Sequence, residues 1–169
     1  MKKSNTKNYL KIQNEVHEKA VQYLRSGQSI EVNKLVTKFG NVQIPIPIYD
    51  VEGIIVSWFV GVTIRNRIVS FLQFDKNLRI MRYSTFMNKD SYVESCPKAF
   101  TWLDPKYIEE QARKKASPDD KLMQPFMTYD GSLSRIVWAV KAREKQDRLK
   151  TIFVTGSYVY LNRKESDSS

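Results

Sequence analysis

Apolar residues recur at helical spacing in the first quarter of the chain. Between residues 8 and 26 they form one stripe, made of Tyr9, Ile12, Val16, Ala20 and Tyr23. This spacing predicts an amphipathic α-helix, and Gly27 fits its C-terminal end. A second, shorter helix is predicted over residues 30–39, with Ser29 as its N-cap. Its apolar stripe would hold Val32, Leu35, Val36 and Phe39.

The period of the pattern then changes to two. Residues 42–49 alternate between aliphatic and other side chains, which is typical of a β-strand, although two of the positions are prolines. A long apolar run follows over residues 54–64. Two further strands, separated by turns of hairpin length, are predicted over residues 68–74 and 79–86. Together these segments predict an antiparallel meander.

A similar succession of elements is predicted in the second half. Asp104 and Pro105 are typical of an N-cap and a first helical residue, and that helix should end near Lys114. Residues 117–120 predict the start of another short helix. After a proline-containing segment, strands are predicted over residues 135–143, 149–155 and 157–162.

These elements divide the chain into two similar units. The predicted organisation is a flexible N-terminus, a first α-β-meander unit, a connector, a second such unit and a disordered tail. Their bounds are residues 1–7, 8–86, 87–103, 104–163 and 164–169. The predicted fold class is α+β, with the two units packed together and the helices on one face of the antiparallel sheets.

The turn sequences of the two halves also agree. Residues 47–53 parallel residues 125–131, because each segment begins with Pro and ends with Gly. The run from Trp58 to Val62 likewise parallels the run from Trp138 to Ala142. The agreement predicts an internal duplication. The alternative is that α+β meanders share this pattern without common descent.

The first unit resembles a known family of small modules. The residues that carry the resemblance are WFVGVTI at 58–64, NRIVSF at 66–71, FD at 74–75 and YSTF at 83–86. A helix followed by this meander is similar to the PepSY and PepSY-like units, which are related in shape to cystatin-like folds and often occur in tandem. The resemblance covers residues 8–86 and, more faintly, 104–162. It implies a non-catalytic binding or inhibitory module.

The net positive charge of the chain indicates a class of partner. The 169 residues contain 28 Lys and Arg against 18 Asp and Glu, a formal net charge of +10. Such a surplus favours an anionic partner, whether nucleic acid, a membrane surface or an acidic protein. The hairpin at residues 135–150 is rich in basic residues, and only Glu144 and Asp147 oppose them. Its candidate anion or nucleic-acid patch consists of Arg135, Lys141, Arg143, Lys145, Arg148 and Lys150.

Two interpretations of this basic hairpin stay open. Phosphate contacts by the cations, with base stacking on Tyr158 and Tyr160, would make it a nucleic-acid-binding surface. In the alternative interpretation the same residues only solvate the outer face of an antiparallel sheet. The second interpretation is favoured, because acidic residues interrupt the patch and no base-reading motif accompanies it.

The sequence predicts no catalytic site, no metal and no cofactor. His17 has helical neighbours that supply neither a nucleophile nor an orienting acid. A single cysteine, Cys96, excludes an intramolecular disulfide and any multi-cysteine metal site. The adjacent acidic pairs at residues 109–110 and 119–120 would point about 100° apart on a helix and form no dyad. The chain also lacks a glycine-rich phosphate loop.

The remaining expectations concern location and role. The apolar run over residues 53–64 is too short to span a bilayer, and no apolar segment follows the basic start. A cytoplasmic protein is therefore expected, although a leader removed from a precursor stays compatible with this sequence. The predicted function is a non-enzymatic binding or regulatory module of PepSY-like form, with an unknown protein or small-molecule partner. The alternatives are nucleic-acid binding by the hairpin and an enzyme with an unrecognised site.

Overall fold

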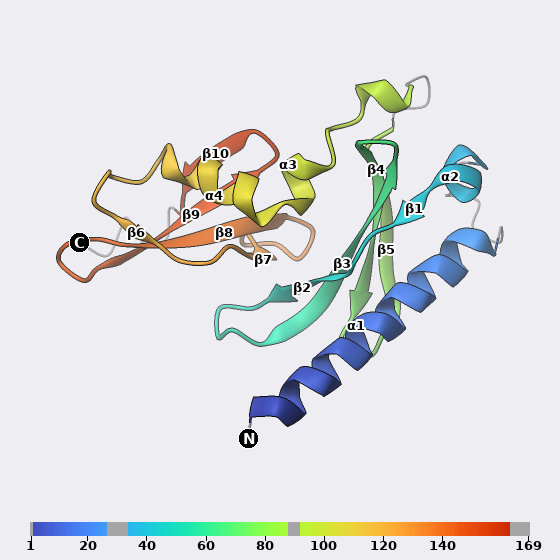
Figure 1. Cartoon of the computed structure of the whole chain (residues 1–169), viewed down its shortest axis with the longest axis horizontal. Coiled ribbons are helices and arrows are strands. Elements are labelled where there is room, and N and C mark those ends of the chain that lie inside the picture. The colour runs from blue at the N-terminus through green and yellow to red at the C-terminus, as the bar shows by residue number, and fades with distance from the viewer. Residues whose placement is uncertain (1, 27–33, 88–91, 163–169) are drawn as a thin grey trace. The chain divides into compact units, whose positions relative to one another are not determined.

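A computed structural model describes residues 2–26, 34–87 and 92–162, and it divides the chain into two compact units (Figure 1). Unit 1 comprises Met1–Ile48 and Ile55–Ala99. Unit 2 comprises Tyr49–Ile54 and Phe100–Ser169, so that it includes the tip of a hairpin whose strands lie mainly in unit 1. Both units contain helices and antiparallel strand pairs, which confirms the α+β class.

Two helices belong to unit 1. Helix α1 spans Lys2–Arg25 and begins six residues earlier than the apolar stripe predicts. Its buried side chains are Val16, Ala20 and Leu24, spaced four residues apart on one face. Helix α2 spans Lys34–Phe39. Its predicted first residues and N-cap, and the glycine predicted to end α1, lie outside the described residues.

Unit 1 contains five strands of the sheet. They are β1 (Asn41–Val42), β2 (Ile46–Tyr49), β3 (Ile55–Ile64), β4 (Arg67–Asp75) and β5 (Ile80–Thr85). Strands β2 to β5 are neighbours in sequence order, and β1 also pairs with β3. The single strand predicted over residues 42–49 is therefore wrong, because the chain leaves the strand conformation between Val42 and Ile46. Pro45 lacks a backbone N–H, and its carbonyl instead accepts a hydrogen bond from Gln13 Nε2 at 2.9 Å.

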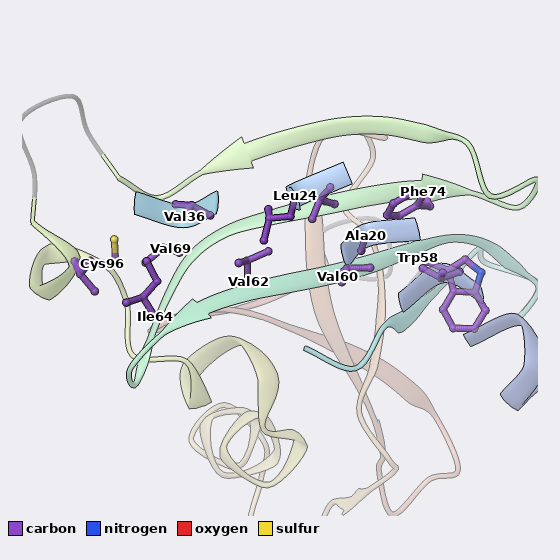
Figure 2. Packing of buried hydrophobic residues seen from close by; sticks show 13 residues of the cluster. Ala20, Leu24, Val36, Trp58, Val60, Val62, Ile64, Val69, Phe74 and Cys96 are labelled. Carbon is purple, nitrogen blue, oxygen red and sulfur yellow. The ribbon is translucent and has the colours of Figure 1, made fainter. Parts of the chain in front are cut away.

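The core of unit 1 lies between α1 and one face of this sheet. Alternate residues of β3 supply Trp58, Val60 and Val62, which are buried with Leu24 of α1 and Val36 of α2 (Figure 2). Across the β3–β4 pair, Trp58 faces Phe74 and Val60 faces Leu72. Alternate residues of a strand thus pack against residues spaced four apart on one helix face, as the two periodicities of the sequence predict.

The predicted connector at residues 87–103 contains structure of its own. A 3₁₀ turn, η1, spans Val93–Ser95, and helix α3 spans Phe100–Leu103. The backbone N–H of Ile68 donates to Pro97 O at 3.0 Å, and that of Ala99 donates to Asn66 O at 2.8 Å. Val93 and Cys96 are also buried in the unit 1 core, so this part of the connector is packed against unit 1. Residues 88–91 of the connector lie outside the described part of the chain.

Unit 2 begins with α3 and α4 and continues as a meander. Helix α4 spans Pro105–Arg113, and Asp104 caps it by accepting a hydrogen bond from the Lys106 N–H, which confirms the predicted start. The strands are β6 (Lys121–Leu122), β7 (Phe126–Tyr129), β8 (Ile136–Arg143), β9 (Leu149–Thr155) and β10 (Tyr158–Leu161). Strands β7 to β10 are neighbours in sequence order, and β6 also pairs with β8.

The short helix predicted at residues 117–120 is wrong. The segment forms a turn in which the Asp120 N–H donates to Ser117 O at 3.0 Å. In return, the Ser117 N–H donates to Asp120 Oδ2 at 2.8 Å. The Asp120 carboxylate therefore closes the turn by accepting the Ser117 N–H. The chain then continues directly into β6 and forms no helix.

Candidate anion-binding surface

The residues of the predicted basic patch lie on one hairpin of unit 2. Lys141 and Arg143 belong to β8, Lys145 lies in the turn, and Lys150 belongs to β9. Arg148 immediately precedes β9. Arg135, the remaining candidate, lies just before β8. The hairpin itself is where the sequence predicts it, because β8 and β9 pair in register from Trp138–Val154 to Arg143–Leu149.

The arginines of this patch each have an acidic partner within unit 2. Arg143 Nε lies 3.5 Å from Asp147 Oδ1, and Arg148 Nε lies 3.3 Å from Glu144 Oε2. Arg135 Nη1 lies 3.7 Å from Asp130 Oδ2. Each pair is partly exposed, so its contribution to stability is small, but the carboxylate still reduces the potential that a phosphate would meet.

The lysines of the patch are also engaged. Lys145 Nζ lies 2.7 Å from Asp119 Oδ2. Lys150 Nζ lies 2.6 Å from Asp120 Oδ2 and 3.3 Å from Glu144 Oε1. Its hydrogen bond to Asp120 raises the pKa of the Lys150 ammonium despite partial burial. Lys141 Nζ instead lies 5.8 Å from the centre of the Phe126 ring. Five of the six cations of the patch are therefore already paired with carboxylates.

The two tyrosines proposed as a stacking platform have different environments. The hydroxyl of Tyr160 donates to Asp130 Oδ2 at 2.7 Å, and its ring packs edge-on against Phe153 with centroids 5.6 Å apart. Burial is the main cause that raises the pKa of Tyr160 to about 12, and the hydrogen bond to Asp130 adds to it. Tyr158 is exposed. A base would therefore find one free ring here and not two.

Net charge is distributed very unequally between the units. Unit 1 contains 15 Lys and Arg against 6 Asp and Glu, whereas unit 2 contains 13 against 12. Almost the whole surplus of +10 therefore belongs to unit 1. The sequence prediction placed the basic patch in unit 2 because basic residues are dense in the hairpin. It did not count the acidic partners Asp119 and Asp120, which are distant from the hairpin in sequence.

Unit 1 carries an exposed group of cations on α1 and α2. Lys19, Lys34 and Lys38 are exposed, and no carboxylate within the described residues forms an ion pair with them. The Arg25 guanidinium donates to Thr37 O and to Gly40 O, both at 3.2 Å, and so joins the end of α1 to the end of α2. Sequence reasoning missed this group, since the lysines of α2 are few and lie beside apolar residues.

The apolar stripe predicted for α2 is only partly buried. Val36 is fully buried, but Leu35 is 38% exposed and Phe39 is 55% exposed. Lys38 Nζ lies 5.1 Å from the centre of the Phe39 ring. Leu35 and Phe39 are four residues apart, as are Lys34 and Lys38, so each pair follows one line along the helix surface. The surface of α2 thus combines two apolar and two cationic side chains.

The reactive side chains of the chain have structural roles. Nε2 of His17 lies 3.3 Å from Val42 O, which ties α1 to β1. The thiol of Cys96 is buried in the unit 1 core, and this burial raises its pKa, so the nucleophilic thiolate is disfavoured. Within the described residues, no group of three or more His, Cys, Asp or Glu is placed to hold a metal ion. Nor does any helix in those residues have the length and apolarity needed to cross a membrane.

Comparison with known proteins adds no relative. No family model, curated protein or solved structure matches the chain. The resemblance of residues 8–86 to the PepSY-like units therefore stays a prediction.

Proposed function

We propose that the protein is a non-enzymatic binding module of PepSY-like form, made of two related α-β-meander units, and that unit 1 binds an anionic partner. The observation that carries this proposal is the distribution of charge, with 15 basic against 6 acidic residues in unit 1 and near neutrality in unit 2. A concentrated surplus of one sign attracts the opposite charge and accelerates association.

The roles of the reactive groups support a binding function over an enzymatic one. His17 is used to join a helix to a strand, and Cys96 is part of the core. Asp120 is paired with Lys150 and closes a turn. General acid–base or nucleophilic catalysis needs such groups to converge on an accessible point, and these three serve separate structural purposes.

Support for a relation between the units comes from the strand registers. In unit 1, Trp58 faces Phe74; in unit 2, Trp138 faces Val154. Corresponding residues of these two pairs are 80 positions apart. The same offset relates the pair Asn41–Thr63 to the pair Lys121–Arg143, at the short strands β1 and β6. Two sets of four successive strands, β2 to β5 and β7 to β10, with the same neighbour order and one constant offset favour an internal duplication.

Backbone details follow the same offset. The Gln43 N–H donates to Gly61 O, and the Met123 N–H donates to Lys141 O. Pro45 and Pro125 each stand between a two-residue strand and a four-residue strand. The offset of 80 pairs Pro45 with Pro125, whereas the alignment of residues 47–53 with 125–131 uses 78. The shared proline interruption explains why both units split their first strand in the same way.

Nucleic-acid binding through the basic hairpin is the less favoured alternative. Five of its six cations form ion pairs with carboxylates of the same unit. A phosphate would have to displace those carboxylates or share their partners, which weakens the gain from each contact.

Retention of the intact chain on immobilised heparin, a polyanion, tests the proposal. The triple variant Lys19→Gln/Lys34→Gln/Lys38→Gln removes three charges from unit 1. The matched variant Arg143→Gln/Lys145→Gln/Arg148→Gln removes three from unit 2. We expect the first variant to elute at clearly lower salt than the wild type and the second to elute close to it. A greater loss in the unit 2 variant would contradict the proposal and favour the hairpin.

A further inference from the structure

Helix α2 presents its exposed side chains from a fixed position. The Arg25 guanidinium donates hydrogen bonds to the carbonyls of Thr37 and Gly40, and the Gly40 N–H donates to Val36 O at 2.7 Å. Val36 is fully buried in the core between α1 and the sheet. Figure 1 shows α2 beside the C-terminal end of α1. A rigidly held surface loses little conformational entropy when it binds.

The surface formed by α2 and the end of α1 is named the α2 corner. It consists of Arg25, Lys34, Leu35, Lys38 and Phe39. Leu35 and Phe39 remain exposed, whereas Val36 between them is fully buried in the unit 1 core. Lys34 and Lys38 run beside them, so that an apolar line and a cationic line lie next to each other. This composition is typical of a helix that lies in the interface of a membrane.

We propose that the α2 corner docks unit 1 onto the surface of an anionic phospholipid bilayer. The inference rests on the proposed binding function and names its partner. Leu35 and Phe39 enter the boundary between headgroups and acyl chains, while the ammonium groups of Lys34 and Lys38 contact lipid phosphates. Lysine stems are long enough to cover apolar surface while their charges stay among the headgroups. The complementary charge of the bilayer supplies the attraction.

The same observations disfavour a nucleic acid as the partner. Sequence-tolerant binding of single strands uses several aromatic rings on which successive bases stack. The α2 corner offers one ring, Phe39, and that ring already lies under Lys38. Leu35 has no stacking role, whereas an aliphatic side chain gains free energy when it leaves water for the acyl-chain boundary.

Vesicle co-sedimentation of the intact chain tests the inference. The vesicles contain phosphatidylcholine with about one third phosphatidylserine, and pure phosphatidylcholine vesicles serve as the comparison. We expect binding to the anionic vesicles only, and weaker binding as salt increases. Lys34→Gln/Lys38→Gln should weaken the partition coefficient about 30-fold, since each lysine contributes about 1 kcal/mol near such a surface.

The apolar pair is tested separately from the charges. Leu35→Ser/Phe39→Ser should strongly reduce vesicle binding but leave heparin retention unchanged, because it alters no charge. The matched control is Leu133→Ser, at an exposed aliphatic residue of unit 2, which should retain full vesicle binding. Unchanged thermal unfolding midpoints would show that these exposed positions leave the fold intact.

The outcomes separate this inference from the proposed function. If the chain ignores anionic vesicles while its heparin retention depends on unit 1, the lipid partner is wrong and the proposed function stands. If the chain binds neither vesicles nor heparin, both fail. Saturable binding of a single-stranded oligonucleotide that Phe39→Ser abolishes, without vesicle binding, would assign the corner to nucleic acid and overturn the inference.

Discussion

Lys150 Nζ lies 2.6 Å from Asp120 Oδ2, and the two side chains are 22% and 5% exposed. This pair joins strand β9 to the turn that follows α4. The same aspartate accepts the Ser117 N–H through its carboxylate and the Arg113 guanidinium through its backbone carbonyl at 2.8 Å. Three charge-assisted hydrogen bonds, one of which closes the turn, therefore meet at a single residue of unit 2.

We predict that Asp120→Asn destabilises the protein much more than Asp119→Asn. The neighbouring pair of Asp119 with Lys145 is 65% and 77% exposed, and such a pair contributes at most about 0.5–1 kcal/mol. Asp120→Asn instead leaves the largely buried Lys150 without its main partner. Thermal unfolding of both variants at neutral pH measures the difference. Equal midpoints would contradict the structural role assigned to the Asp120–Lys150 pair.

The same pair gives a dependence on pH with a defined sign. The hydrogen bond from Lys150, followed by that from Ser117, lowers the pKa of Asp120 from its usual value of 3.8. Its stabilisation is therefore complete above about pH 4 and is lost as the pH falls through the lowered pKa. We expect the difference in unfolding midpoint between wild type and Asp120→Asn to shrink as the pH falls below about 4. A difference that stays constant down to acid pH would contradict this linkage.

A second prediction compares two leucines of the same helix. Leu24 is fully buried in the unit 1 core, whereas Leu10 is half exposed on α1. Leu24→Ala removes buried methyl groups and leaves a cavity, so the free energy of unfolding should fall by about 3 kcal/mol. Leu10→Ala should change it by less than about 1 kcal/mol. Denaturant unfolding measures both values. A similar loss of unfolding free energy at the two positions would contradict the arrangement in which α1 buries Leu24 and exposes Leu10.

The predictable part of the fold depends on local periodicity and capping. Strand β9 matches its predicted bounds, because residues 149–155 lie between two turns. The start of α4 was predictable from Asp104 and Pro105, whose preference for these positions is intrinsic to the two side chains. Helix and strand periods together were enough to define the α+β class.

The missed features depend on contacts between distant residues. Asp119 and Asp120 lie more than 20 residues before the lysines that they neutralise, so a local count of charge overestimates the free charge of the hairpin. The helix predicted at residues 117–120 fails in part for the same reason, since the Asp120 carboxylate pairs with the distant Lys150 as well as accepting the nearby Ser117 N–H. The exposure of Phe39 depends on which side of α2 meets the core.

A third prediction concerns two glycines with different constraints. A Cβ on Gly40 would collide with Val36 O and would lie 2.8 Å from Val62 Cγ1. Gly53 has open space around it but a φ of +80°, which favours glycine. Gly40→Ala should therefore lower the free energy of unfolding by about 3 kcal/mol and Gly53→Ala by about 1 kcal/mol.

Asparagine separates the two causes. Because it tolerates the left-handed region, Gly53→Asn should recover part of the stability lost in Gly53→Ala. Gly40→Asn should be at least as unstable as Gly40→Ala, since the collision there depends on the Cβ and not on the backbone angle. Recovery at Gly40 with asparagine would show that close packing is not the constraint at that position.

The last prediction concerns the phenol of Tyr160. Burial, together with the hydrogen bond to Asp130, raises its pKa from 10 to about 12. Because the folded protein favours the neutral phenol, this stabilisation is complete below about pH 10 and is lost as the pH rises towards 12. Subtracting the phenolate absorbance of Tyr160→Phe from that of the wild type should give a titration with a midpoint near 12.

Asp130→Asn provides the control for the carboxylate, because it removes the negative charge beside the phenol while keeping a similar shape. The same subtraction, made in the Asp130→Asn background, should move the Tyr160 midpoint towards 10, but not fully to it, since burial is the larger cause of the shift. Tyr158→Phe, at an exposed neighbour on the same strand, should leave thermal stability unchanged. A Tyr160 midpoint near 10 in the wild type would mean that β10 does not hold this side chain against Phe153 and Asp130.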